Sequence, residues 1–237
     1  MNKSFFSFSI SLVTFQALIA ASLSVSILAL SFFVLEPQIS HGDQSVDFNI
    51  RQEITDETSF LVPPANVTMT GPINGLTGGN ATGSTQFVVR SNNPGGYTVE
   101  IEFEDNAGNH AMRGDSSGGE EIRDYSGMVG GTVPSFNFVA STAAQFAYSA
   151  YSSTTADTPV PFRNDGSACN VGSNVTFGTC WRTPNTGSTV LVASRTSPAP
   201  TGATSTLLFR VNVPSGASPA PTAQTYTATA TLSVTAI

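Results

Sequence analysis

The chain has 237 residues and a net charge of −7, with 16 acidic and 9 basic side chains. Lys3 is its only lysine, so the chain lacks the basic surface that the phosphates of nucleic acids require. Charged residues make up only 11% of the sequence, while Gly, Ser, Thr, Asn and Ala are abundant. This composition is typical of extracellular β-proteins, which stay soluble through hydroxyl and amide groups.

The first 42 residues read as a secretory signal. Lys3 precedes an almost uncharged apolar run from Phe5 to Leu35, which ends at Glu36-Pro37 and is followed by the small and polar residues 40–42. We expect cleavage after residue 42. The run exceeds the usual apolar core of a signal peptide, so an uncleaved membrane anchor is the alternative. In both cases the remainder is secreted or at the cell surface, and the membrane is touched only through this segment.

The residues after the signal carry a period-two pattern with an apolar face formed by Val46, Phe48, Ile50 and Ile54. A polar stretch at 55–59 separates them from the rest. One interpretation is a first strand that packs in its own domain. The other is a strand donated to a groove of a neighbouring subunit, with 55–59 as the hinge. We therefore divide the chain into a signal (1–42), an N-terminal strand and linker (43–59) and a main domain (60–237).

Alternation of apolar and polar residues dominates the main domain, which predicts β-strands. Strands are expected at 65–70, 135–140, 145–151, 188–194 and 205–213. The turn-forming residues 91–96 lie between the apolar runs 86–90 and 97–103, which predicts a β-hairpin. The fold class is all-β: an antiparallel β-sandwich of roughly eight to ten strands, preceded by the N-terminal signal helix.

The C-terminus shows the clearest alternation, with Tyr226, Leu232 and Val234 on one face and hydroxyl side chains on the other. It predicts one long strand over 225–237 in or near the centre of a sheet. Two stretches without alternation, 105–133 and 152–187, predict long loop insertions of an accessory or functional kind. The segments 197–203 and 214–221 are rich in proline and predict connectors.

Two cysteines, Cys169 and Cys180, lie close together in the second insertion. In an exported chain such a pair predicts a disulfide bond. A zinc site is the rival interpretation, but two thiolates without a nearby histidine make a poor one. The C-x-x-C spacing of a redox centre is absent, so we expect a structural disulfide.

Catalytic residues are scarce in the sequence. After cleavage His110 is the only histidine, and no G-x-S-x-G motif accompanies it, so we predict that the protein is not an enzyme. Oxygen-bearing side chains in glycine-rich loops suit a hard cation, and bound calcium is the one cofactor the sequence suggests. Solvated acidic loops are the alternative. The calcium candidates are Asp105, Asn106, Asn109, Asp115, Glu120, Glu121 and Asp124.

The run ITDETSFLVPPANVTMTGPINGLTGGNATGSTQFVVRSNNPGGYTVEI and the end TYTATATLSVTAI resemble a recurrent pattern in uncharacterised secreted bacterial all-β surface proteins. The pattern is similar to cell-surface domains of the WxL type and to fimbrial or spore-coat-type β-sandwiches. It covers roughly residues 54–103 and 225–237. The resemblance implies a cell-surface location. The paired Trp-x-Leu motifs of the WxL type are not present, since Trp181 is the only tryptophan.

These features predict a non-enzymatic, secreted or cell-surface structural protein, such as a self-assembling filament or envelope subunit. Its partners would be other copies of itself or envelope components. The alternative is a monomeric, adhesin-like binding module that recognises a glycan or a protein through its two insertions. A structural subunit would polymerise or sediment with the envelope, whereas a binding module would stay monomeric.

Overall fold

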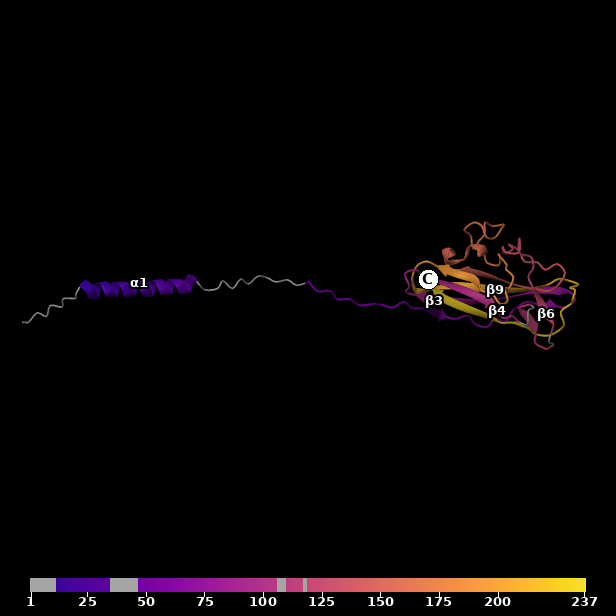
Figure 1. Ribbon diagram of the computed structural model, residues 1–237. Helices are drawn as coiled ribbons and strands as arrows, with labels where there is room; N and C mark the ends of the chain where they lie inside the picture. Colours follow the sequence, from indigo (N-terminus) through magenta and orange to yellow (C-terminus); the bar gives the residue numbers. More distant parts are fainter. Residues whose placement is uncertain (1–11, 35–46, 106–109, 117–118) are drawn as a thin grey trace, which may run out of the picture. The chain divides into compact units, whose positions relative to one another are not determined.

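A computed structural model describes residues 12–34, 47–105, 110–116 and 119–237 (Figure 1). The chain divides into two units, Met1–Gln52 and Glu53–Ile237. The described elements are α1 (Leu12–Val34), β1 (Thr58–Val62), β2 (Ile73–Asn74), β3 (Gly78–Ser91), β4 (Tyr97–Phe103), β5 (Met112–Gly114), β6 (Glu121–Asp124), β7 (Gln145–Ser152), η1 (Thr155–Asp157), η2 (Val160–Phe162), β8 (Val190–Arg195), β9 (Ala199–Val213), β10 (Tyr226–Ala228) and β11 (Ala230–Ala236).

Helix α1 lies within the predicted signal, and serines interrupt its apolar sequence. The hydroxyl groups of Ser22, Ser24 and Ser26 donate to carbonyl oxygens one turn earlier, at 2.8–2.9 Å. This internal pairing lets a helix carry serines without leaving their hydroxyl groups unsatisfied. Over the residues whose side chains the structure describes, no helix is long and apolar enough to cross a membrane. The predicted cleavage point after residue 42 lies outside the described residues.

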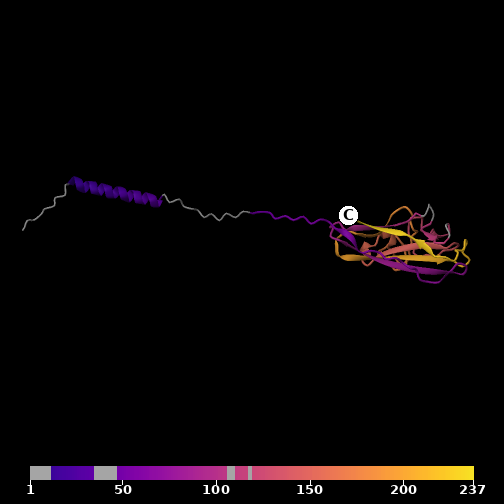
Figure 2. The ribbon, with the colours of Figure 1, turned by 90° about the horizontal axis from the view of Figure 1, so that it is seen from below.

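The second unit is a sandwich of two sheets, so the predicted all-β class is confirmed (Figure 2). An eight-stranded sheet has the order β1-β3-β9-β7-β6-β5-β10, with β2 also paired to β3. A three-stranded sheet has the order β11-β4-β8. The pairs are antiparallel except for β6 and β7, which are parallel and make the large sheet mixed. The three-stranded sheet is too narrow to cover the whole inner face of the eight-stranded sheet, so the sandwich has a closed side and an open side.

The predicted hairpin at 86–103 is wrong, because β3 and β4 belong to different sheets. The turn between them carries the chain from one layer to the other. Asn93 Oδ1 accepts a hydrogen bond from the Gly95 N–H at 2.7 Å, and Gly96 has a positive φ of 87°. A side chain at Gly96 would collide with the carbonyl oxygen of Arg195. The sequence located this turn correctly, but the apolar faces of its two strands meet across the core.

The predicted single strand at 225–237 is also different in the structure. The chain leaves regular pairing at Thr229 and divides into β10, which pairs with β5, and β11, which pairs with β4. Both are edge strands of their sheets. The expectation of a central strand was therefore wrong, because an alternating pattern shows which face is apolar but not how many neighbours the strand has.

Three of the predicted strands, at 145–151, 188–194 and 205–213, are confirmed as β7, β8 and β9. The described main chain at 65–70 and 135–140 forms no strand and contributes isolated bridges. Strand β9 begins at Ala199 and so includes Pro200, which was expected in a connector. Proline is tolerated there because β7 pairs with β9 only from Ser205 onward, which leaves an edge at the beginning of β9.

The main core lies between the sheets. Phe103 of β4 is 1% exposed, and its ring centroid lies 5.9 Å from that of Phe146 and 5.2 Å from that of Tyr148, both on β7. A smaller cluster packs on the outer face of the large sheet, and its members are Tyr125, Phe138, Ala147, Trp181 and Leu208. The two predicted insertions contribute Tyr125 and Trp181, so parts of both cover the sheet.

The side of the sandwich next to β8 is closed. Phe162 of η2 is buried and packs on Tyr148, with ring centroids 6.1 Å apart. The carboxylate of Asp157 in η1 pairs with Arg195 at the end of β8, with an N–O distance of 2.8 Å. On the side next to β11, β1 approaches β11, and residues 64–69 line an open groove between the sheets.

Candidate functional site

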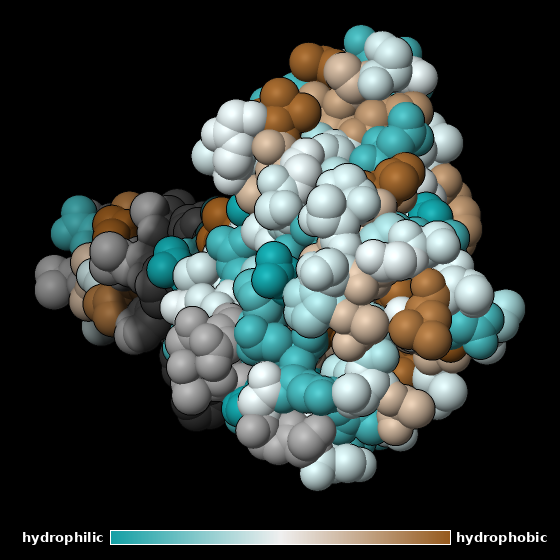
Figure 3. Space-filling model, turned by 90° about the vertical axis from the view of Figure 1, so that its right-hand side faces the viewer, coloured by the Kyte–Doolittle hydropathy of each residue, from teal (hydrophilic) through white to brown (hydrophobic). Residues whose placement is uncertain are grey.

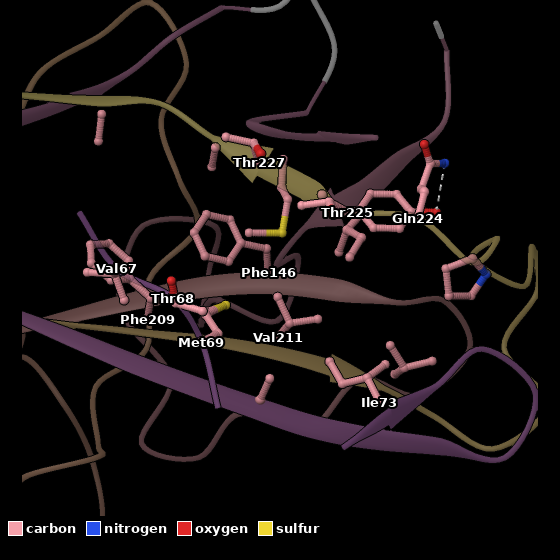
Figure 4. A pocket seen from close by; sticks show the side chains of 18 of the residues that line it. Val67, Thr68, Met69, Ile73, Phe146, Phe209, Val211, Gln224, Thr225 and Thr227 are labelled. Atoms are coloured by element: carbon pink, nitrogen blue, oxygen red, sulfur yellow. Dashed lines mark hydrogen bonds between the residues drawn. The ribbon is translucent and has the colours of Figure 1, made fainter. Parts of the chain in front are cut away.

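A groove of about 1250 Å³ opens between the two sheets beside β10 and β11 (Figure 4). Phe146, Phe209 and Val211 of the large sheet form its floor. Across from them lie Ile101 on β4 and Leu232 on β11. The groove is open at the surface, and its lining combines these apolar side chains with polar ones such as Asn66, Thr68 and Gln224.

The edge of β10 and β11 that borders the groove has main-chain groups available for pairing. On the paired side, the N–H of Asp115 donates to the carbonyl of Thr225 at 2.9 Å, and that of Glu104 to Thr229 at 3.0 Å. Main-chain groups of an antiparallel strand alternate between its two sides, so even-numbered residues point their groups to the open edge. Those that line the groove are Tyr226, Ala228, Ala230 and Leu232.

The burial of side chains on β11 and β4 is consistent with an open edge at β11. Leu232 and Val234 on β11 are only partly buried, although they pack against the core. Their register partners on β4, Ile101 and Val99, are 1% and 0% exposed. The two strands present equivalent apolar faces, and the difference arises because β4 has a neighbour on each side.

Glu120 holds the rim of the groove. Its Oε2 accepts hydrogen bonds from the Thr222 hydroxyl, from Gln224 Nε2 at 2.5 Å and from the Tyr226 hydroxyl at 3.3 Å. Asp115 acts similarly, because its Oδ2 accepts from the Thr227 hydroxyl at 3.2 Å. Two of the calcium candidates therefore fix the chain that leads into β10.

Two other calcium candidates surround His110. The His110 Nε2 lies 3.6 Å from Glu121 Oε1, and its Nδ1 lies 3.6 Å from Asp124 Oδ2. Asp124 Oδ1 also accepts from the Ala111 N–H at 3.0 Å. Burial raises the pKa of Asp124 above its usual range, while the Ala111 hydrogen bond and His110 oppose this shift. The cluster joins β5 to β6 at the end of the large sheet.

The calcium candidates are thus divided between two groups rather than gathered in one site. Asp105 is exposed, and Asn106 and Asn109 lie outside the described residues. Among the described residues, no group of three or more His, Cys, Asp or Glu side chains could hold a metal ion. Calcium binding stays a prediction.

The predicted assembly residues are strongly exposed. Phe48 is 79%, Ile50 86% and Ile54 82% exposed, and described residues 47–57 form no strand. Val46 lies outside the described residues. The interpretation of this segment as a strand of its own sandwich is therefore not what the structure shows.

The predicted hinge at 55–59 differs in the structure. Asn92 Nδ2 donates to the Thr55 carbonyl at 3.1 Å, and β1 begins at Thr58. The polar stretch is therefore anchored to the sandwich, because Asn92 forms a hydrogen bond with its main chain. The described apolar side chains with strong exposure, those of Phe48, Ile50 and Ile54, precede Thr55.

The predicted disulfide is confirmed between Cys169 and Cys180, whose Cα atoms are 5.6 Å apart. Cys180 is fully buried, and Trp181 beside it is 2% exposed. The Trp181 ring lies 5.7 Å from that of Phe138, and its indole N–H donates to the Gly178 carbonyl at 3.0 Å. Trp181 is therefore part of the outer cluster and is not an exposed contact residue.

On the face shown in Figure 3, hydrophobic residues stand in small groups among hydrophilic and neutral ones. No protein-family model matches the chain, and no curated protein is significantly similar to it.

Proposed function

We propose that the protein is a non-enzymatic structural subunit of the cell surface or extracellular matrix that assembles with copies of itself through residues 47–54. The observation that carries the proposal is the exposure of Phe48, Ile50 and Ile54 on one face of an alternating segment. Leaving such side chains in water costs about 1.5–3 kcal/mol each relative to burial. Three in eight residues would thus favour association strongly.

The proposed location is supported by the leader-like first 42 residues and by the disulfide, which suits an oxidising compartment. The resemblance to WxL-type domains and fimbrial or spore-coat-type sandwiches supports the same location. An exposed segment on one copy and a receiving surface elsewhere on the next form a heterologous contact. Contacts of this kind produce rings when the rotation closes and filaments when it does not.

The test uses the exported protein, purified as its host releases it. We expect filaments or rings in electron micrographs and species larger than a monomer by size exclusion with light scattering. Replacing Phe48 and Ile50 together by Asp should abolish both, since unpaired charges are costly to bury. The matched control places Asp at Asn49 and Arg51 on the opposite face, and it should still assemble.

A protein that remains monomeric at high concentration would contradict the proposal. Equal loss of assembly in the variant and its control would also contradict it, because the effect would then be one of charge rather than of the apolar face. A monomer would favour the adhesin-like binding module instead.

A further inference from the structure

We infer that the groove beside β10 and β11 is the seat for residues 47–54 of a second copy of the chain, which would add a strand to the open edge. The inference rests on the proposed self-assembly and specifies where it occurs. The occupant is identified by three properties of the groove: its length, the direction of its main-chain groups and its apolar floor.

Length is the first match. Residues 47–54 extended as a strand span about 26 Å, and the edge from Tyr226 to Leu232 spans about 23 Å. The donated segment contains no proline or glycine, so every residue keeps its N–H and can adopt the extended conformation. The segment is therefore long enough to cover the whole edge that lines the groove.

The phase of the alternation is the second match. Even-numbered residues of β10 and β11 point their N–H and C=O groups to the open edge, and on β11 the residues that line the groove, Ala230 and Leu232, are even-numbered. Residues directly opposite one another on paired strands share a face of the sheet. Phe48 and Ile50 would lie opposite these even-numbered residues, and Asn49 and Arg51 would face outward.

The apolar floor is the third match. Phe146, Phe209 and Val211 present rings and methyl groups to the groove and leave no charged side chain among them. Two of these rings, Phe146 and Phe209, are stacked with centroids 6.2 Å apart. A phenylalanine and isoleucine side chain inserted above them would fill the space that the three-stranded sheet leaves uncovered.

The proposed donor is a second copy of the chain, and the donated segment ends just before the point at which its own chain is fixed to the sandwich. Asn92 binds the main chain at Thr55 and Glu57.

Cross-linking tests the seat and its phase. Ile50→Cys is combined in the exported protein with Ala228→Cys or Ala230→Cys, which lie on the groove face. The matched control combines it with Thr231→Cys, which is not among the residues that line the groove. After mild oxidation, non-reducing gels should show a ladder of covalent oligomers with a groove-face partner. The yield should exceed the control by about tenfold, because disulfides require Cα atoms within about 7 Å.

A second variant blocks the edge without a new thiol. Ala230→Pro removes an N–H that points to the open edge, and an edge strand tolerates such a proline. We expect retained strand content by circular dichroism and lost assembly. Filaments that form normally in this variant, or ladders that are equal on both faces, would overturn the groove while leaving self-assembly standing. A monomer cross-linked within itself, or no assembly at all, would overturn both.

Discussion

Asn92 and Glu57 bind each other through their main chains and through the Asn92 side chain. Asn92 Oδ1 accepts from the Glu57 N–H at 2.6 Å, and the Asn92 N–H donates to the Glu57 carbonyl at 3.1 Å. Arg90 adds an exposed ion pair to the Glu57 carboxylate at 3.4 Å. These contacts of Glu57 with Asn92 and Arg90 fix the point at which the chain joins the sandwich, immediately before β1.

Asn92→Ala should loosen that junction. It removes two side-chain hydrogen bonds at an exposed position, so we expect a loss of about 0.5–1.5 kcal/mol in the free energy of unfolding. Amide hydrogen exchange at Glu57 should accelerate more than exchange in β3. Asn92→Asp is the comparison variant, because it keeps the acceptor to Glu57 while it loses the donor to Thr55 and adds a negative charge. If amide exchange at Glu57 were unchanged in Asn92→Ala, the Asn92 side chain would not be what fixes the chain before β1.

Position in the sheet predicts unequal costs for two similar truncations. Ile101→Ala on β4, which has neighbours on both sides, should cost about 2–5 kcal/mol. Leu232→Ala on the edge strand β11 should cost about 1 kcal/mol in the monomer, because its side chain is only partly buried. Urea unfolding of both variants measures the difference. If the two costs were equal in a monomer, β11 would already be covered.

Removal of the disulfide should lower the free energy of unfolding of the domain without unfolding it. Replacing Cys169 and Cys180 by Ala should cost about 3 kcal/mol, since the closed loop is short and the unfolded chain regains its freedom. Circular dichroism should still report the native strand content, because the disulfide lies at one side of the core. A variant that does not fold at all would mean that η2 and the disulfide nucleate the sandwich.

The raised pKa of Asp124 predicts a dependence of stability on pH. Between the usual value of 3.8 and the higher folded-state value, the native protein binds more protons at this site than the unfolded chain. Stability from this group therefore increases as the pH falls through that window and decreases as the pH rises through it. The Asp124→Asn variant should lack this contribution. Urea midpoints of both proteins across the window test the sign, and a wild type that gains stability relative to the variant with rising pH would contradict it.

The sequence predicted the fold class, the disulfide and three of the longer strands, because alternation and cysteine pairing are local properties. It did not predict that β3 and β4 lie in separate sheets. Phe87 and Tyr97 have the same alternating pattern in a hairpin and across a core, so only the tertiary structure distinguishes the two arrangements. The division of the C-terminal strand at Thr229 could not be predicted either, because the alternation continues through it while the pairing partner changes from β5 to β4.

The groove could not be predicted from the sequence, although its parts could. Leu232 was placed on an apolar face, and Phe209 lay within the predicted strand at 205–213. The sequence does not show how many strands each sheet has. The groove forms because one sheet has eight strands and the other has three. The exposed segment at 47–54 was recognised by its alternation, while its anchor at Asn92 lies in a turn that carries no signal of that contact.

The C-terminus has a practical consequence for anyone who labels this protein. The Ile237 N–H donates to the Gly96 carbonyl at 3.2 Å, and the C-terminus lies at the same end of the sandwich as the start of β1 (Figures 1 and 2). An affinity tag fused after Ile237 would therefore crowd the proposed junction between successive subunits. The turn at Gly130-Gly131, where an added side-chain atom would meet nothing within 4 Å, is the better place for an epitope or a fluorophore.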